Sequence, residues 1–326
     1  INAENNEIIF TSGGTEADNI ALRCAVNDFG VSRIITTKIE HHAVGHTAED
    51  LKLTHGVELI YLNTDSKGHI SIEELKSTLQ KDQDTTSLVS LMHANNEIGT
   101  ILPLQEVADI CNQYENVFFH SDTVQTMGHY FFDVKKLNID FLTCSAHKLH
   151  GPKGIGFLYA NKRVITKALI TGGGQERSKR CGTENIYGII GLAKAIELAF
   201  NNLSKHKEEI QHLKTYMINE FLKIDKTITF NGDISPEKSL YTVLNVCFSN
   251  NVCNSMLLFS LDLFGIAASG GSACSSGSNV GSHVLAQLPN QNNCQSIRFS
   301  FSRLTTIKEI DFTLEKIRGI IDNGGE

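Results

Sequence analysis

Short apolar runs alternate with longer helical patterns through the first half of this chain, and this alternation restricts the fold more than any other feature. Strands that alternate with helices predict an α/β fold, a mainly parallel sheet with helices on both faces. The expected strands are residues 7–10, 33–36, 58–62, 86–91, 117–120, 140–144 and 155–159. The expected helices are residues 16–27, 43–55, 72–80 and 104–114. Such sheets bind ligands at the carboxyl ends of their strands, so polar residues there are candidates for function.

The pattern changes from about residue 187, and we place the domain boundary near residue 202. Apolar residues at helical spacing then predict long helices, and shorter apolar runs predict a second, smaller set of strands. The expected helices are residues 187–202, 205–224, 254–263 and 307–321, and the expected strands are 227–230, 240–248 and 296–301. We therefore expect a large α/β domain over residues 1–202 and a smaller α+β domain over residues 203–326.

Composition narrows the function classes. The 326 residues carry a net charge of −7 with a pI near 6.0, whereas nucleic-acid binding favours a basic face. No apolar run approaches the length of a membrane span, so we expect no membrane partner. The 8 cysteines form no CxxC pair, which is typical of reduced thiols in the cytoplasm. The chain opens on Ile1, just before a strand, and we expect that a preceding segment is missing.

The segment 145–154, SAHKLHGPKG, follows one of the expected buried strands. A lysine at such a position is costly unless it is paired or chemically used. Desolvation lowers the pKa of an amine, and the neutral amine is the form that makes a Schiff base. Lys148 is therefore a candidate catalytic residue. The alternative is an ordinary surface lysine at a strand end.

Two further segments follow expected strands and offer groups for an anion or a cation. Residues 11–16, TSGGTE, open a helix, and its free N–H groups suit an anion, although a tight turn with an N-cap explains the segment equally well. Residues 120–125, HSDTVQ, place Asp122 at the end of a buried strand. A protonated ring nitrogen would satisfy that carboxylate, and a helix N-cap is the structural alternative.

Histidines are concentrated after two other strands. In residues 40–46, EHHAVGH, His42 and His46 have the spacing of a metal pair, but no carboxylate or cysteine ligand motif stands nearby and we expect no metal. An imidazole stacked on a planar ligand, or a plain helix N-terminus, fits the segment better. Residues 92–100, MHANNEIGT, form the second such segment.

Two glycine-rich segments complete the set. Residues 172–185 combine three glycines with basic residues, which indicates a mobile loop near an anion or a solvated linker. Residues 269–278 place Cys274 among Ser, Gly and Ala, a composition with little to bury. A lone cysteine is often buried and inert, but a thiol on such a loop is available to react.

Taken together and in this order, these segments resemble the cysteine desulfurases of the NifS/IscS type. Those enzymes belong to the class V aminotransferase-like group of fold type I and use pyridoxal 5′-phosphate (PLP). The resemblance runs from residues 10–16 to residues 296–300. The lysine motif with its GPKG tail and the NNEIG motif are specific to this branch, and the SAC segment narrows it to desulfurases with a longer catalytic loop.

The resemblance implies roles in a cofactor site. Lys148 matches the lysine that forms the Schiff base with PLP, Asp122 the acid that pairs with the ring nitrogen, and His41 the imidazole that stacks on the ring. Residues matching the phosphate cradle are Gly14, Thr15, Ser145 and His147. Residues matching contacts near the phenolic oxygen are Asn96 and Gln125.

The resemblance also implies the reaction and its partners. Cys274 matches the nucleophile that takes sulfur from L-cysteine as a persulfide while alanine leaves, and Arg298, with Asn96, matches the substrate-binding groups. Thr183 matches a hydroxyl that reaches the phosphate of the partner subunit, so we expect a homodimer. The sulfur would pass to an acceptor protein, an iron–sulfur scaffold or a thiolation relay.

Departures from the family pattern keep alternatives open. A segment resembling Asp-Asn-Ala-Ala-Thr, which normally precedes the present start, is absent, and Cys181 stands where serine is more usual. The alternatives are another class V PLP enzyme, a selenocysteine lyase or an aminotransferase, and an inactive sulfur-relay or scaffold partner.

Overall fold

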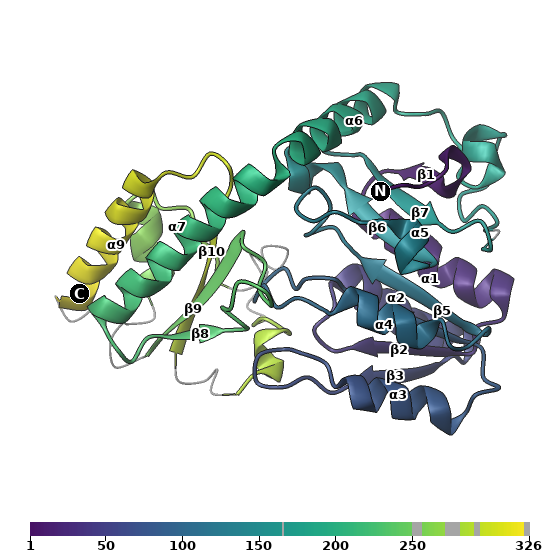
Figure 1. Ribbon diagram of the computed structural model, residues 1–326, viewed down its shortest axis with the longest axis horizontal. Coiled ribbons are helices and arrows are strands. Elements are labelled where there is room, and N and C mark those ends of the chain that lie inside the picture. The colour runs from purple at the N-terminus through teal and green to yellow at the C-terminus, as the bar shows by residue number, and fades with distance from the viewer. Residues whose placement is uncertain (165, 250–255, 271–280, 290–293, 323–326) are drawn as a thin grey trace. The chain divides into compact units, whose positions relative to one another are not determined.

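The computed structural model describes residues 1–164, 166–249, 256–270, 281–289 and 294–322 (Figure 1). The chain divides into two compact units. The first comprises residues 1–63, 70–93 and 102–203, and the second comprises residues 64–69, 94–101 and 204–326. Across the described ranges, every helix is too short or too polar to cross a membrane.

The first unit contains a seven-stranded sheet in the order β1-β7-β6-β5-β4-β2-β3. Its strands are β1 (Ile8–Thr11), β2 (Arg33–Thr37), β3 (Glu58–Leu62), β4 (Ser87–Ser90), β5 (Val117–Asp122), β6 (Phe141–Ser145) and β7 (Gly156–Ala160). Neighbours from β3 to β6 are parallel, whereas β7 is antiparallel to both β6 and β1. The expected mainly parallel sheet is confirmed, and β1 runs in the same direction as β6.

Helices cover both faces of this sheet because its strands are apolar on both sides. Ile34 of β2 packs with the cluster formed by helices α1 (Gly14–Phe29) and α2 (His42–His55). Its neighbour Ile35 packs on the opposite face, with α3 (Ile72–Lys81), α4 (Leu104–Cys111) and α6 (Ile186–Asn201). Two short helices that the pattern did not predict, α5 (Val134–Leu137) and the 3₁₀ helix η2 (Ala146–Leu149), lie in the connections.

The second unit contains a three-stranded antiparallel sheet in the order β10-β9-β8. Its elements are α7 (Leu203–Ile224), β8 (Thr229–Asn231), β9 (Val243–Ser249), α8 (Leu257–Leu263), β10 (Cys294–Ser300) and α9 (Ile307–Asp322). One face of the sheet is apolar and packs on α7, where the ring of Phe221 lies 5.5 Å from Phe248 and 5.8 Å from Phe299 between centroids. The other face is polar, as strand alternation requires.

The cysteines differ from the sequence expectation. Cys247 on β9 and Cys294 on β10 form a disulfide with their Cα atoms 5.5 Å apart, so the expectation of reduced thiols is wrong for this pair. The spacing of the two residues in the sequence gives no sign of the pairing, which arises because neighbouring strands place both on one face. Cys24, Cys111, Cys144 and Cys181 are free and buried. Cys253 and Cys274 lie outside the described residues.

Lys214 of α7 is a buried cation in the second unit. Its Nζ donates to Ser239 Oγ at 2.5 Å and to the carbonyl of Leu240 at 2.9 Å. Burial lowers the pKa of Lys214 to about 7, although the charge of Asp233 opposes the decrease. The amine is therefore neutral in the folded protein at a pH where the unfolded chain keeps its proton.

This difference predicts a pH-dependent stability. Between pH 7 and about 10 the unfolded state binds more protons at Lys214 than the folded state, so raising the pH should increase the free energy of unfolding. Lys214→Met should reduce that increase. Urea denaturation of both proteins between pH 7 and 9.5 measures it, with the exposed Lys223→Met on the same helix as control. Identical pH slopes for Lys214→Met and the unchanged protein would contradict the assignment.

Candidate active site

Four connections meet at the carboxyl edge of the large sheet because β1, β2, β5 and β6 run in one direction. They carry the glycines before α1, His41 before α2, Asp122 at the end of β5, and the segment from Ser145 to Lys148 after β6. This edge is where parallel sheets place their ligands. Most of the residues singled out from the sequence therefore lie in one region of the first unit.

Asp122 is a buried carboxyl group in this region, with 6% of its surface exposed. Its Oδ1 accepts a hydrogen bond from the backbone N–H of Val124 at 2.8 Å. Burial raises the pKa of Asp122 to about 7, and the charge of Asp18 adds to the increase, whereas His120 and Lys148 oppose it. A buried carboxyl with a raised pKa is stabilised in its charged form by a cation placed beside it.

Asp18 of α1 and Glu40 before α2 are two buried acids that sequence reasoning missed. Burial raises the pKa of Asp18 to about 7 and that of Glu40 well above its usual value. The charge of Asp18 raises the pKa of Asp122, and the charges of Asp122 and Asp18 raise that of Glu40. Glu40 Oε1 accepts from the backbone N–H of Met92 at 2.7 Å. A sequence signal existed for Asp18, because its helical neighbours Ala21 and Leu22 are apolar and buried.

His120 links this acidic group to the sheet. Its Nδ1 lies 2.8 Å from Ser90 Oγ, and its Nε2 lies 3.1 Å from Thr143 Oγ1 and 3.4 Å from Asp18 Oδ1. Burial lowers the pKa of His120 to about 4, so the imidazole is neutral at pH 7. It therefore orients its neighbours through hydrogen bonds. Because it is neutral, it does not provide the positive charge that would stabilise the carboxylate of Asp122.

His41 lies beside these acids. Its Nδ1 accepts from the backbone N–H of Ala43 at 3.2 Å and so caps α2. A ring nitrogen of His41 and one carboxylate oxygen each of Asp18 and Asp122 all lie within 4.8 Å of one another. The rings of His42 and His46 stack on each other, with centroids 4.6 Å apart. The helix N-terminus considered from the sequence is confirmed.

The start of α1 and the end of β6 approach each other through glycines. Gly13 has a φ of +156°, and a Cβ built on it would lie 3.5 Å from Ser145 Oγ. A Cβ on Gly14 would lie 2.7 Å from Val124 Cγ2, and one on Gly156 would lie 3.0 Å from the Cα of Gly13. The backbone thus forms a narrow turn beside a helix N-terminus, a favourable place for an anion.

Three polar side chains, those of Ser145, His147 and Thr15, come from the segments that form this turn. Ser145 Oγ lies 2.8 Å from His147 Nδ1, and Thr15 is exposed in the first turn of α1. The pKa of His147 is lowered, first by partial burial and then by the charges of Lys148 and Lys153. The four residues expected around a phosphate (Gly14, Thr15, Ser145 and His147) therefore come from two adjoining connections of the first unit.

Lys148 is placed differently from the sequence expectation. The buried strand ends before it, at Ser145, and Lys148 lies on η2 with an exposed side chain. Its desolvation at the strand end is therefore not found. Its charge nevertheless acts on Asp122, which brings the expected lysine and the expected acid into one electrostatic group.

Asn96 and Arg298 belong to the second unit and contact each other there. Arg298 Nη1 donates to the carbonyl of Asn96 at 2.7 Å. The next carbonyl, that of Glu97, accepts from Asn245 Nδ2 at 3.0 Å. Asn95 Oδ1 accepts from the backbone N–H groups of Glu97 and Ile98, which fixes the turn.

Four further residues singled out from the sequence are Gln125, Thr183, Cys181 and Cys274. Gln125 is half-buried in the turn after β5. Thr183 is exposed and, with Ser12 and Asn185, lines a small pocket of about 140 Å³ in the first unit. Cys181 is buried, and its Sγ donates to the carbonyl of Gly173 at 2.7 Å. Cys274 falls among the residues that are not described.

The basic residues of the glycine-rich segment make internal contacts. Arg180 Nε lies 2.7 Å from Glu16 Oε1, and Arg177 donates to the carbonyls of Asn5 and Ile8. These contacts hold the segment against α1 and β1. The mobile loop near an anion and the solvated linker both stay predictions, and in the structure Arg177 and Arg180 donate to other parts of the chain.

The raised pKa values of Asp18 and Asp122 predict how the cofactor-free protein responds to pH. Between pH 4 and 7 the folded state holds protons that the unfolded chain has lost, so raising the pH lowers the free energy of unfolding. Asp18→Asn should reduce this slope by up to about 1.4 kcal/mol per pH unit, the value for one proton. Urea titrations at pH 5, 6 and 7 test it.

The exposed Asp50→Asn is the matched control, since Asp50 pairs with Arg23 at the surface. Its pH slope should equal that of the unchanged protein. If Asp18→Asn gives the same slope as Asp50→Asn, Asp18 is not the buried proton-binding group described above.

Known proteins resemble this chain over nearly its full length. The Aminotransferase class-V family profile matches residues 1–312. The cysteine desulfurase IscS of Clostridium botulinum (strain Hall) is 44% identical over 325 residues, which cover 98% of this chain and 80% of that protein. That of Dictyoglomus turgidum is 44% identical over 328 residues, covering 99% and 81%.

Solved structures agree. A NifS-like protein superimposes with a TM-score of 0.88 at 36% identity, covering 98% of this chain and 84% of its own. A NifS-like protein from Rickettsia africae gives a TM-score of 0.83 at 29% identity, covering 97% and 82%. The resemblance and fold type I expected from the sequence are confirmed: the chain belongs to the class V aminotransferase family, among the cysteine desulfurases.

Proposed function

We propose that this protein is a PLP-dependent L-cysteine desulfurase. The observation that supports this most directly is the buried Asp122 at the carboxyl edge of the sheet, with Asp18 and Glu40 close by. Three buried acids favour the binding of a ligand that carries a positive charge. The protonated ring nitrogen of PLP is such a cation, and the carboxylate of Asp122 would hold it by a charge-assisted hydrogen bond.

The other residues of the first unit fit the rest of PLP. The narrow turn at Gly13 and Gly14, with Ser145 and His147 beside it, suits a phosphate at the N-terminus of α1. The side chain of Lys148 is exposed, and its amine would react with the aldehyde of PLP. His41 would stack on the ring, and Gln125 and Asn96 would contact the phenolic oxygen. When bound, PLP supplies an electron-withdrawing ring that weakens the bonds at the α-carbon of the substrate.

The chain's own side chains then divide the work. Arg298 binds the carboxylate of L-cysteine with its planar guanidinium, and Asn96 completes that site. Lys148 Nζ takes the α-proton and returns a proton to the product. The thiolate of Cys274 attacks the sulfur of the substrate, so a sulfur–sulfur bond forms as the carbon–sulfur bond breaks. Alanine leaves, and Cys274 keeps a persulfide.

The relatives support L-cysteine as the substrate. The curated relatives at 44% identity are called cysteine desulfurase, and a solved relative, SspA, 29% identical with a TM-score of 0.73, was determined in complex with cysteine. We assign cofactor binding to residues 1–202 and the Cys274 segment to a small domain of residues 203–326. We further propose a cytoplasmic enzyme that passes its sulfur to an iron–sulfur scaffold or a thiolation relay protein.

We propose that the enzyme works as a homodimer. The start of α6 exposes large apolar side chains, with Tyr187 93%, Ile190 66% and Ile186 63% exposed. A row of this kind on one helix favours a protein partner, and a second copy would bury it. Thr183 precedes this row and is itself exposed, which leaves its hydroxyl on the surface for the role that the family resemblance implies, a contact with the phosphate in the partner's site.

Sulfur release tests the activity. With PLP present, the protein should form alanine from L-cysteine, and sulfide when a thiol reductant is added. Cys274→Ala should lower alanine formation by several orders of magnitude, as removal of a catalytic nucleophile does, and keep the cofactor absorption band. Lys148→Ala should lose the band as well as the activity. Turnover that survives Cys274→Ala points to a selenocysteine lyase or an aminotransferase, and a protein that binds no PLP points to an inactive partner.

The dimer is tested by changing the α6 row. Tyr187→Glu with Ile190→Glu should halve the mass in sedimentation equilibrium and weaken PLP retention, because Thr183 would no longer reach the partner's site. Leu53→Glu on α2, at a residue that is 85% exposed, is the matched control and should leave the mass unchanged. A wild-type monomer, or an unchanged mass for the α6 variant, would argue against this interface.

A further inference from the structure

The strand residues of the small sheet carry their polar side chains on one face, with Gln295 as the exception. Alternation and register place nine of them there: Thr229, Asn231, Asn245, Cys247, Ser249, Cys294, Ser296, Arg298 and Ser300. The register pairs Cys247 with Ser296 and Arg298 with Asn245. The disulfide between Cys247 and Cys294 and the substrate-binding Arg298 therefore share one surface, and Cys294 and Arg298 share one strand.

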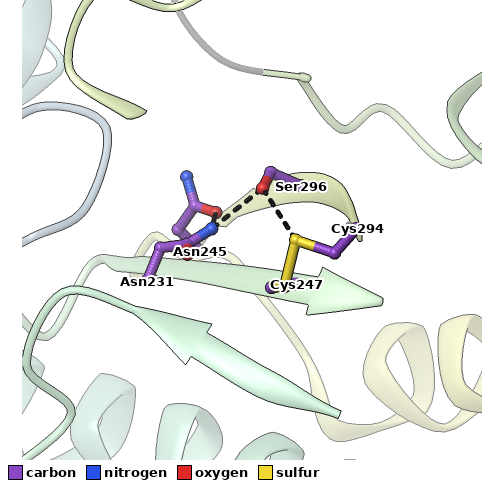
Figure 2. Close-up of a disulfide and its surroundings, with 5 residues drawn as sticks. All are labelled: Asn231, Asn245, Cys247, Cys294 and Ser296. Carbon is purple, nitrogen blue, oxygen red and sulfur yellow. Dashed lines mark hydrogen bonds between the residues drawn. A yellow bond between two sulfur atoms is a disulfide. The ribbon is translucent and has the colours of Figure 1, made fainter. Parts of the chain in front are cut away.

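Hydrogen bonds connect the disulfide to the Arg298 site. Ser296 Oγ lies 3.7 Å from Cys294 Sγ and can donate to it, and the same oxygen accepts from Asn231 Nδ2 at 2.9 Å (Figure 2). Asn231 Nδ2 donates in addition to Asn245 Oδ1 at 2.8 Å. Asn245 in turn donates to the carbonyl of Glu97, next to the carbonyl that Arg298 holds. A continuous polar path thus runs from the sulfur atoms to the Asn96 turn.

β10 itself provides a second path. On its other side, Arg298 exchanges two backbone hydrogen bonds with Ser269, at 2.7 and 3.2 Å. Ser269 opens the segment 269–278 that contains Cys274. The position of β10 therefore sets both the backbone of Arg298 and the start of the segment that carries the proposed nucleophile.

Among the described cysteines, this pair is the accessible one. Cys247 and Cys294 are half-buried, whereas Cys24, Cys111, Cys144 and Cys181 are buried. Burial raises the pKa of Cys24 to about 12 and that of Cys111 and Cys144 further, so these three thiols stay protonated and unreactive. Thiol–disulfide exchange on the described part of the chain is thereby directed to Cys247 and Cys294.

We propose that Cys247 and Cys294 form a reversible thiol–disulfide site for a small or protein dithiol, and that its redox state sets how tightly the Arg298 site holds the substrate carboxylate. The link to substrate rests on the function proposed above. Disulfides in a thiol-rich compartment such as the cytoplasm are usually transient. In that compartment this pair would alternate between the disulfide and the two thiols. The closed disulfide fixes the end of β10, and the open form releases it.

The exchange balances as a two-electron step. A thiolate of the dithiol attacks one sulfur of the disulfide, the bond between Cys247 and Cys294 breaks, and a mixed disulfide forms. The second thiolate of the reagent displaces the protein thiolate. The dithiol leaves as its own disulfide, and two protons from the reagent and solvent complete the two protein thiols. An oxidised dithiol drives the reverse reaction.

Binding of L-alanine to the PLP-loaded enzyme tests the coupling, since alanine has the substrate carboxylate and no thiol. The oxidised enzyme should bind L-alanine about five- to tenfold more tightly than enzyme treated with dithiothreitol and desalted without oxygen, a coupling at the lower end of the usual range. The shift of the cofactor band reports binding. Alkylation with iodoacetamide and mass spectrometry report the state of both cysteines.

Variants separate this coupling from general damage. Cys247→Ser with Cys294→Ser should bind L-alanine like the reduced enzyme, ignore dithiothreitol, and keep the cofactor band and the turnover number while KM rises. Arg298→Lys should remove most of the redox effect. Equal dissociation constants in the two states, or cysteines that resist dithiothreitol, overturn the inference and leave the desulfurase untouched. If neither L-alanine nor L-cysteine shifts the cofactor band in either redox state, both the proposed substrate site and this inference are wrong.

Discussion

The buried carboxyl of Asp122 is the constraint on which the large domain's chemistry depends. Burial raises its pKa to about 7, and the neighbouring Asp18 raises it further instead of relieving it. His120, the imidazole within the same group, is itself neutral because burial lowers its pKa. The protein thus buries acids beside little positive charge of its own. A ligand with a positive charge at this place therefore stabilises the carboxylate of Asp122 and is bound more tightly than a neutral one.

In the small sheet, the alternation of side chains along each strand gives the two faces different tasks. Its apolar face buries Phe248 and Phe299 against α7, and its polar face keeps Arg298 in contact with the Asn96 turn. Packing and the proposed substrate binding therefore use opposite sides of the same three strands. A change in strand position made for one purpose affects the other directly.

The fold was largely readable from the sequence because periodicity and strand-end chemistry are local. The strands of the large sheet and the helices between them lie close to their expected bounds, and His41, Asp122 and Ser145 occupy the edge where a parallel sheet binds ligands. Three features depended on tertiary contacts that local patterns do not contain. These are the exposure of Lys148, the burial of Glu40, and the pairing of Cys247 with Cys294.

Gly156, at the start of the antiparallel strand β7, has a wider consequence. A Cβ there would come within 2.3 Å of the carbonyl of Cys144 and 3.0 Å of the Cα of Gly13, so main chain packs on main chain beneath the turn before α1. The shape of that turn is therefore set by the backbone of the sheet and not by side chains that a substitution could change. If the phosphate of PLP binds at this turn as proposed, a cofactor analogue with a bulkier anionic group would require moving a strand, whereas the side chains proposed around the ring are open to ordinary substitution.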